Sequence, residues 1–328
     1  MKLIRTEDAV GHVLCHDLTQ IIKGVSKDAR FRKGHVVTKE DIPVLLSIGK
    51  EHLYVWEMAE GMLHENEAAD VLRSICQNEY MEASAPKEGK INLIAKCDAV
   101  LKIRRDKLLQ INSLGEMMIA TKRGDLPVKK GQVFAGMRVI PLVIEKEKME
   151  KAREVAGSEP ILSLLPIKTK KAAILATGSE IYKGRIPDSF TPVVEEKLKE
   201  FGAEVIFKKI LDDKALMTTA AIREAVDRGA ELVCVTGGMS VDPDDRTPLA
   251  IRNTGAEVVT YGAPVLPGAM MMLAYLENKD GALIPVIGLP GCVMYAKKTI
   301  FDLILPRLLA DDRVKAEELC ALGEGGLL

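Results

Sequence analysis

The sequence predicts an α/β protein, with a three-layer wound sheet in the C-terminal half and an α+β, β-rich accessory domain before it. In the C-terminal half, apolar runs of strand length alternate with amphipathic helical segments. Glycine-rich segments follow three of these strands. A charged stretch at 145–153 separates this pattern from a first half with short β-type runs. We therefore predict an accessory domain over 1–165, a wound domain over 166–311 and a C-terminal tail over 312–328.

Composition narrows the class of protein. The chain has 328 residues, of which 47% are hydrophobic, enough for two compact cores. The 46 basic and 47 acidic residues nearly cancel, so we expect no nucleic-acid partner. The first residues and the apolar runs predict neither a signal peptide nor a membrane span. Six cysteines without repeated spacing indicate reduced thiols, so we expect a cytoplasmic protein.

The first half predicts two helices followed by strands. Thr38 and Asp41 are typical of a capped helix start, and apolar residues up to Ile48 continue that helix until Gly49. A second helix is expected over 67–80. From Lys90 onward, apolar runs predict a small β structure such as a partly closed barrel, in the order INLIA, AVLKI, KLLQI, MMIAT and VFAGMRVIPLVI.

The second half predicts a strand and helix alternation. Helices are expected at 188–202, 214–229 and 247–253, with a final helix that ends near residue 309. Strands are expected at 172–178, 204–210, 231–238, 257–263 and 283–291. A ligand of such a sheet binds where strands end and helices begin, because backbone N–H groups and helix dipoles converge there.

Three strand-end loops combine glycine with hydroxyl or proline residues. They are TGSE at 177–180, TGGMS at 236–240 and GLPG at 288–291. Glycine lets the backbone approach a ligand closely, and Thr and Ser add hydroxyl donors beside the amides. Together the loops predict a phosphate cradle, although none matches the P-loop or the dinucleotide fingerprint. A single loop of this kind is equally well explained by the tight turns that any α/β domain needs.

Carboxylates accompany the loops. Clustered acids would repel a phosphate unless a hard cation such as Mg²⁺ bridges them, so the pattern implies a metal supplied with the ligand. For Asp188 and Asp213 we favour helix capping, and for Glu180 and Asp245 we favour function. The acids in question are Glu180, Asp188, Asp212, Asp213, Asp242, Asp244 and Asp245.

The ordered motifs TGSE, GRIPDSF, LDD, TGGMSVDPDD, GAEVVTYGAPVLPG and GLPG resemble one family over residues 171–310. It is the domain shared by molybdopterin molybdotransferases, molybdopterin adenylyltransferases, gephyrin and competence-damage proteins. The resemblance implies a pterin phosphate against the TGG loop, catalytic acids at Glu180, Asp212 and Asp245, and metal ligands at Glu180, Asp242 and Asp245. The implied pterin contacts are Thr177, Gly178, Ser179, Asp188, Ser189, Thr236, Gly237, Gly238, Ser240, Pro267, Gly268, Pro290, Gly291 and Cys292.

The chain also departs from the molybdotransferase pattern. An Asp of that group falls on Pro243, and its Pro-Gly-Lys-Pro becomes 267–270, PGAM. Its GLPGNP becomes GLPGCV, and its N-terminal Asp-Gly-Tyr-Ala loop has no counterpart. Loss of the lysine removes a phosphate or molybdate contact. In contrast, the DDRT segment is similar to the competence-damage and adenylyltransferase versions.

For two further groups of residues we favour a structural role over metal binding or cofactor contact. His12, Cys15, His16 and His35 could bind a soft metal, but their spacing is not a standard zinc pattern, so we expect a structural cluster. Cys292 could touch molybdenum or the dithiolene of the cofactor, yet a cysteine at a helix start is often only a small buried residue.

Three functions stay open on the sequence. The first is a molybdotransferase-like transferase that uses Mg²⁺ to act on molybdopterin or its adenylylated form, with molybdate as a further candidate ligand. The second is a carrier or chaperone without catalysis that hands mature cofactor to a molybdenum enzyme. The third is hydrolysis of a nucleotide pyrophosphate, as in competence-damage proteins. Members of this family commonly form oligomers, so we expect a homo-oligomer.

Overall fold

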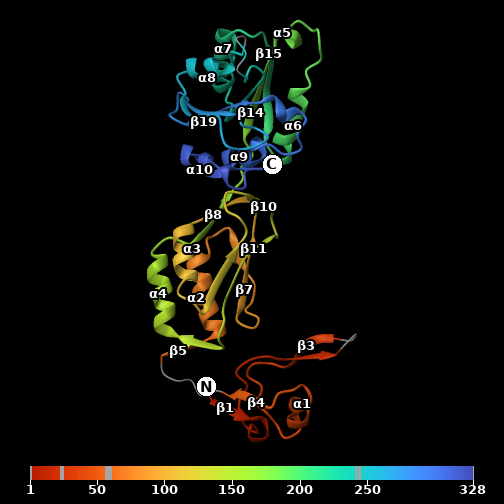
Figure 1. Cartoon of the computed structure of the whole chain (residues 1–328), viewed down its shortest axis with the longest axis vertical. Coiled ribbons are helices and arrows are strands. Elements are labelled where there is room, and N and C mark those ends of the chain that lie inside the picture. Colours follow the sequence, from red (N-terminus) through yellow and green to blue (C-terminus); the bar gives the residue numbers. More distant parts are fainter. Residues whose placement is uncertain (1, 23–25, 56–60, 241, 243–244, 328) are drawn as a thin grey trace. The chain divides into compact units, whose positions relative to one another are not determined.

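The computed structural model describes residues 2–22, 26–55, 61–240, 242 and 245–327 (Figure 1). The chain forms two compact units, each described here by itself. Unit 1 comprises 1–96, 103–122 and 131–163, and unit 2 comprises 97–102, 123–130 and 164–328. Unit 2 therefore includes two short segments from the middle of the first half. In the described residues, no helix is long and apolar enough to cross a membrane.

The N-terminal part of unit 1 contains two small antiparallel sheets. In one, β1 (Lys2–Arg5) pairs with β4 (His52–Val55), and in the other β2 (Leu18–Ile22) pairs with β3 (Ser26–Phe31). A short helix η1 (Thr6–Asp8) follows β1. The expected first helix is confirmed as α1 (Asp41–Ser47), and the Asp41 carboxylate accepts a hydrogen bond from the Thr38 backbone N–H.

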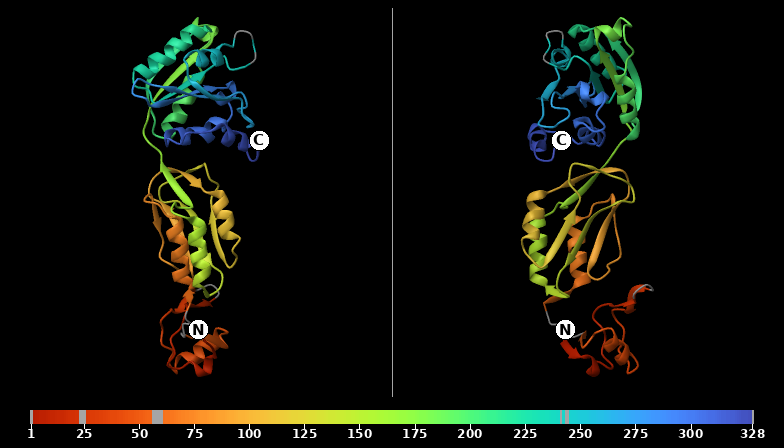
Figure 2. Two further views of the ribbon diagram at one scale, coloured as in Figure 1. Left: turned by 90° about the vertical axis from the view of Figure 1, so that its left-hand side faces the viewer. Right: turned by 45° about the vertical axis from the view of Figure 1, so that its right-hand side comes forward.

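The remainder of unit 1 is a sheet with three helices. The antiparallel strands lie in the order β6 (Met81–Ala83), β7 (Lys90–Ala95), β11 (Val133–Val139) and β9 (Met117–Thr121). A second pair joins β5 (Met62–His64) to β12 (Val143–Glu145). Figure 2 shows α2 (Glu65–Cys76), α3 (Arg105–Asn112) and α4 (Lys146–Ala156) together on one side of the sheet. The expected second helix is confirmed as α2.

Three expectations for this region are wrong. The KLLQI run forms α3, because its apolar residues follow helical spacing: Ile111 is buried and Leu109 is exposed. The charged stretch 145–153 is not a junction but most of α4, whose apolar face buries Met149 and Ala152. The β structure is an open sheet with β6 and β9 at its edges, not a barrel.

Unit 2 confirms the wound sheet. Six strands lie in the order β15 (Glu204–Leu211), β14 (Lys171–Thr177), β16 (Leu232–Thr236), β19 (Leu283–Leu289), β18 (Met272–Glu277) and β17 (Glu257–Tyr261). The first four are parallel, and β18 and β17 run antiparallel to their neighbours. Buried strands explain the apolar runs in the sequence, since both faces are covered.

Alternate residues of the central strands enter two separate cores. Ile174 and Cys234 face a core with α6 (Phe190–Glu200) and α9 (Ile300–Leu309). Leu175 and Val235 face the opposite core, with α7 (Ala215–Asp227) and α8 (Thr247–Asn253). Helices therefore cover both faces of the sheet, which is the predicted three-layer arrangement.

Short elements complete the fold. A three-stranded sheet has the order β10 (Pro127–Val128), β8 (Ala99–Ile103) and β13 (Leu162–Pro166). Beyond the strands of unit 2 lie α5 (Ser179–Tyr182) and η2 (Gly291–Met294), and the chain continues after α9 into α10 (Ala316–Cys320) and η3 (Ala321–Gly323). Within the segment expected to be a tail, Val314 and Leu319 are buried in the core that contains α9.

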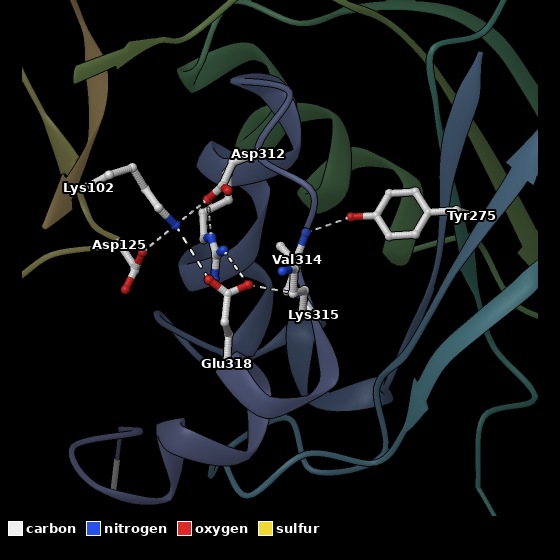
Figure 3. A network of polar contacts seen from close by, with 8 residues as sticks. Lys102, Asp125, Tyr275, Asp312, Val314, Lys315 and Glu318 are labelled. Carbon is white, nitrogen blue, oxygen red and sulfur yellow. Dashed lines mark hydrogen bonds and ion pairs between the residues drawn. The ribbon is translucent and has the colours of Figure 1, made fainter. Parts of the chain in front are cut away.

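Ionic contacts fix this last segment within unit 2 (Figure 3). The Arg307 side chain is only 5% exposed, and its guanidinium contacts Asp312 at 2.5 Å and Glu318 at 2.9 Å. The Lys102 Nζ atom lies 2.6 Å from Asp125 and 2.9 Å from Asp312. We call these five residues the Arg307 network. The Tyr275 hydroxyl also accepts a hydrogen bond of 2.9 Å from the Val314 N–H.

Candidate functional site

The loops singled out in the sequence follow neighbouring parallel strands. The TGSE loop follows β14, the TGGMS loop follows β16 and the GLPG loop follows β19, while Asp212 follows β15. Because these strands are parallel, their carboxyl ends lie at one edge of the sheet. The chain leaves β14 for β15 on one side and returns as β16 on the other. The TGSE and TGGMS loops thus flank the topological switch point, the usual ligand crevice of such sheets.

Threonine hydroxyls tie the first two loops together. The Thr177 Oγ1 atom donates to the Thr236 carbonyl oxygen at 3.2 Å and lies 3.3 Å from the Thr247 Oγ1 atom. The Thr247 hydroxyl in turn donates to the Gly237 carbonyl at 2.8 Å, and its N–H donates to the Gly238 carbonyl at 3.1 Å. These bonds preset the shape of the glycine pair at the start of α8.

Only glycine fits at position 237. Its φ of 83° lies in the left-handed region, and a Cβ atom there would lie 2.1 Å from the Thr177 carbonyl oxygen. The neighbouring Gly238 has φ 54°. The two glycines therefore bring the backbone of the TGGMS loop directly against the TGSE loop.

One hydroxyl in this loop is buried and unused. The Thr236 side chain is 1% exposed, and its Oγ1 atom has no hydrogen-bond partner among the residues that the structure describes. A buried hydroxyl without a partner costs about 1–3 kcal/mol. This hydroxyl belongs to the last residue of β16, directly before the glycine pair.

Acids from three strand-end loops act electrostatically on Asp213. The Ser179 N–H donates a 2.6 Å hydrogen bond to the Asp213 carboxylate, and the Ser179 hydroxyl lies 3.3 Å from Glu180. Burial raises the pKa of Asp213, and so does repulsion from the other acids, against the lowering effect of the Ser179 N–H. The repelling groups are Glu180, Asp212 and Asp245. The predicted acids at these three positions therefore lie close enough to act on one carboxylate.

Backbone bonds hold the acidic loop after β16. The Asp245 carboxylate accepts the Ser240 N–H at 2.7 Å, and the Asp245 N–H donates to the Asp242 carbonyl at 3.0 Å. The Asp242 side chain is exposed. Pro243 and Asp244, both singled out in the sequence, lie outside the described residues.

Asp188 caps a helix. Its carboxylate accepts the backbone N–H groups of Phe190 at 2.9 Å and of Thr191 at 3.1 Å, at the start of α6. Ser189 is the exposed residue before that helix. A Cβ atom on Gly291 would lie 3.9 Å from the Phe190 ring, so the α6 start lies beside the turn after β19. In that turn Pro290 is buried, and burial raises the pKa of the half-buried Cys292 thiol.

The segment between β17 and β18 approaches the same edge. Met272, the first residue of β18, pairs with Gly288 near the end of β19. Before it, the Leu266–Pro267 peptide bond is cis, and the Pro267 carbonyl accepts the Ile300 N–H at 3.2 Å. A Cβ atom on Gly268 would lie 2.5 Å from the Ile300 side chain. These predicted residues thus pack against the start of α9.

Metal ligands are not preassembled in the described part of the chain, where no three His, Cys, Asp or Glu side chains converge to hold an ion. This holds for the N-terminal histidines too. His35 bonds the Asp41 carboxylate at 2.7 Å, and the buried Nδ1 atom of His16 has no partner among described residues.

The roles of two residues at this site differ from what the sequence indicates. The expected helix cap at Asp213 is wrong, because its carboxylate accepts the Ser179 N–H instead. Its position directly beside Asp212 at a strand end was the available signal. The sequence carries no such signal for Thr247, because its role depends on how the first residue of α8 contacts Gly237 and Gly238.

The chain is similar to known proteins in two separate stretches. Residues 173–310 match a family described as "Probable molybdopterin binding domain", and residues 3–57 match a domain of unknown function, DUF8806. A molybdopterin molybdenumtransferase of Staphylococcus aureus is 28% identical over 166 residues, 48% of this chain and 36% of that protein. A CinA-like protein of Mycobacterium avium is 32% identical over 90 residues, 27% of this chain and 21% of that protein.

Among solved structures, a molybdopterin biosynthesis enzyme MoaB of Thermus thermophilus is 22% identical. The matched part covers 43% of this chain and 92% of that chain, with a TM-score of 0.35. The similarity to molybdopterin-binding domains is thus carried by residues 173–310. The chain spans about a third of the length of the molybdenumtransferase that it matches.

Proposed function

We propose that unit 2 binds molybdopterin, or its adenylylated form, through the pterin phosphate and acts in molybdenum cofactor biosynthesis. The observation that carries the proposal is the Thr236 hydroxyl, buried and without a described partner beside a glycine that admits no side chain. A phosphate oxygen at this place would satisfy the hydroxyl. It would also receive backbone N–H groups of the glycine pair, which is how glycine loops bind phosphates.

We further propose that Mg²⁺ accompanies the phosphate. The support is the repulsion among Asp213, Glu180, Asp212 and Asp245, which a cation would relieve. Mg²⁺ usually takes one or two carboxylates together with phosphate oxygens and water, so it needs no preformed cage. Glu180, Asp242 and Asp245 are the ligands we propose. Bound Mg²⁺ would supply neutralisation of phosphate charge, and the chain would supply orientation.

Isothermal titration of the full chain with molybdopterin, with and without Mg²⁺, tests both statements. We expect binding that strengthens with Mg²⁺ and weakens about tenfold in Thr236→Val. Absence of heat from any pterin phosphate, with the protein folded, would refute the proposed ligand. Binding of equal strength with and without Mg²⁺ would refute only the proposed role of the cation.

Turnover separates the transferase from the alternatives. Protein incubated with adenylylated molybdopterin, Mg²⁺ and molybdate should release the adenylyl group and yield metal-loaded cofactor. Tight binding without product would support a carrier that passes the cofactor to a molybdenum enzyme, and the alanine at position 269 instead of lysine favours this outcome. Hydrolysis of a dinucleotide alone would support the pyrophosphatase.

The proposal includes a cytoplasmic location and the self-association of the chain. All six cysteines are free, and Cys15, Cys76 and Cys234 are buried, which suits the reducing cytoplasm. Large apolar side chains are exposed near the candidate site, for instance Leu216 at 79% and Tyr295 at 77%. We propose that these side chains contribute to the interface of a homo-oligomer. Sedimentation at micromolar concentration should show a species larger than the monomer, and a monomer would refute the association.

A further inference from the structure

An open pocket of about 600 Å³ lies in the N-terminal part of unit 1. Its volume is in the range of pockets that hold small organic molecules. It falls within the domain of unknown function and has no part in the pterin proposal. The lining residues come from the end of β3, the turn that follows it and α1: Arg30, Phe31, Arg32, His35, Asp41 and Val44.

The charge of this pocket is positive and uncompensated. Arg30 and Arg32 are exposed, and neither forms an ion pair or hydrogen bond with another described side chain. The one acid in the lining is already engaged. The Asp41 carboxylate binds His35 Nε2 at 2.7 Å, the Thr38 N–H at 2.8 Å and the Thr38 hydroxyl at 2.9 Å. Hydrogen bonds from His35 and Thr38 outweigh partial burial and lower the pKa of Asp41, so it remains a hydrogen-bonded anion.

The turn that carries these cations is held in place. The Gly34 N–H donates to the Leu14 carbonyl at 2.9 Å, the Leu14 N–H donates to the His35 carbonyl at 2.9 Å, and the Lys33 N–H donates to Asp17 at 2.7 Å. The buried Phe31 ring lies 5.2 Å from the His35 ring. The backbone beside the arginines is therefore ordered before any ligand arrives, which reduces the entropy lost on binding.

We propose that this pocket binds a phosphorylated small molecule, with the phosphate held by Arg30 and Arg32. Two planar guanidinium groups that pair with no described acid match the oxygen geometry of a phosphate ester. A cavity of this volume leaves room for an organic group beside the phosphate, and Phe31 and Val44 offer it apolar surface. His35, held by Asp41, would present its other ring nitrogen as a polar contact of fixed orientation.

NMR of the histidine rings in the full chain tests the proposal locally. The chain has five histidines, and His35→Gln identifies the His35 signals. Ribose 5-phosphate is the probe and ribose is the neutral control, at about 0.15 M salt to screen diffuse attraction. We expect ribose 5-phosphate to shift the His35 ring signals in a saturable way and ribose to leave them unchanged.

Variants assign the binding to the arginines. Arg30→Gln and Arg32→Gln should each weaken binding about tenfold or more, because each removes a charged hydrogen-bond donor. Arg5→Gln is the matched control. Arg5 is an exposed arginine in the same N-terminal part of unit 1, and it forms an ion pair with Glu7. The signals of the other histidines report whether each variant is folded. No His35 shift in the wild type, or an equal loss in Arg5→Gln, would overturn the proposal, and neither result would bear on the pterin site in unit 2.

Discussion

The Ser179 N–H and the Asp213 carboxylate, 2.6 Å apart, join the loop after β14 to the loop after β15. This bond places the Asp213 carboxylate among three further acids, whose repulsion adds to the effect of burial and raises the pKa of Asp213. The ionised form is thus less favourable in the folded chain than in the unfolded chain. Asp213 stabilises the fold most at low pH, and this contribution is lost as pH rises through the folded pKa.

A bound cation should restore the stability that is lost when Asp213 ionises. We expect Mg²⁺ to raise the melting temperature of the wild type at pH 7 and to raise it less at pH 4, because the raised pKa of Asp213 favours its protonated form as pH falls. Asp213→Asn keeps an oxygen acceptor for the Ser179 N–H but removes one charge, so the gain from Mg²⁺ should shrink. Asp280→Asn, an exposed acid in the turn between β18 and β19, should respond like the wild type. An equal response in all three proteins would contradict the site.

The two threonines at the ends of β14 and β16 should differ in their effect on stability. Thr177→Val removes a hydroxyl with described partners and should lower the free energy of unfolding by about 1 kcal/mol. Thr236→Val removes a hydroxyl without a described partner and should leave the free energy of unfolding unchanged or slightly raised. Urea unfolding measures both. A larger loss in Thr236→Val would show that its hydroxyl is already bonded.

Gly237→Ala should disrupt the site as well as the fold. The new Cβ atom would meet the Thr177 carbonyl oxygen, and the left-handed φ adds strain, so we expect a loss of about 3 kcal/mol or more. Gly255→Ala is the control, with φ 78° and nothing within 4 Å of its Cβ position. It should cost only about 1–2 kcal/mol. Similar losses in both variants would mean that the loops can separate.

His64 should make unit 1 sensitive to acid. Its Nε2 atom lies 2.6 Å from the Cys15 carbonyl oxygen and must carry the proton, so Nδ1 accepts from Asn66 N–H and lies 3.0 Å from Lys33 Nζ. Burial, followed by the Lys33 charge, lowers the pKa of His64 from 6.5. The unfolded chain therefore binds the proton first as pH falls. Stability should be complete above pH 6.5 and decline below it.

His64→Asn tests this origin, because asparagine can still accept a hydrogen bond at the start of α2 but cannot titrate. Chemical unfolding between pH 7.5 and 5 should show a flatter pH profile in this variant than in the wild type. Burial also lowers the pKa of His16, so part of the slope should persist. An unchanged slope in His64→Asn would assign the whole effect to other groups.

The wound sheet could be predicted because its signals are local. Strands such as Lys171–Thr177 are buried on both faces and therefore appear as continuous apolar runs. The strand expected within Arg105–Asn112 is wrong because three apolar residues in the five-residue run KLLQI fit a strand as well as a helix. Periodicity alone cannot separate such short segments.

The site was predictable only as a set of strand ends. Parallel order places the carboxyl ends of β14, β16 and β19 at one edge, and glycine-rich loops identify them. The partner of the Asp213 carboxylate depends on the pairing of β14 with β15, where Thr177 is aligned with Leu211. Neither segment alone determines the register between two strands that are distant in sequence.

The Arg307 network bears on where this protein can be divided. A fragment that starts at residue 166 follows the sequence pattern but leaves out Lys102 and Asp125. Asp312 and Glu318 would then share one nearly buried guanidinium, and the excess negative charge would lie against the last helices. The smallest fragment that keeps unit 2 intact is thus discontinuous along the polypeptide, and it must include residues 97–102 and 123–130.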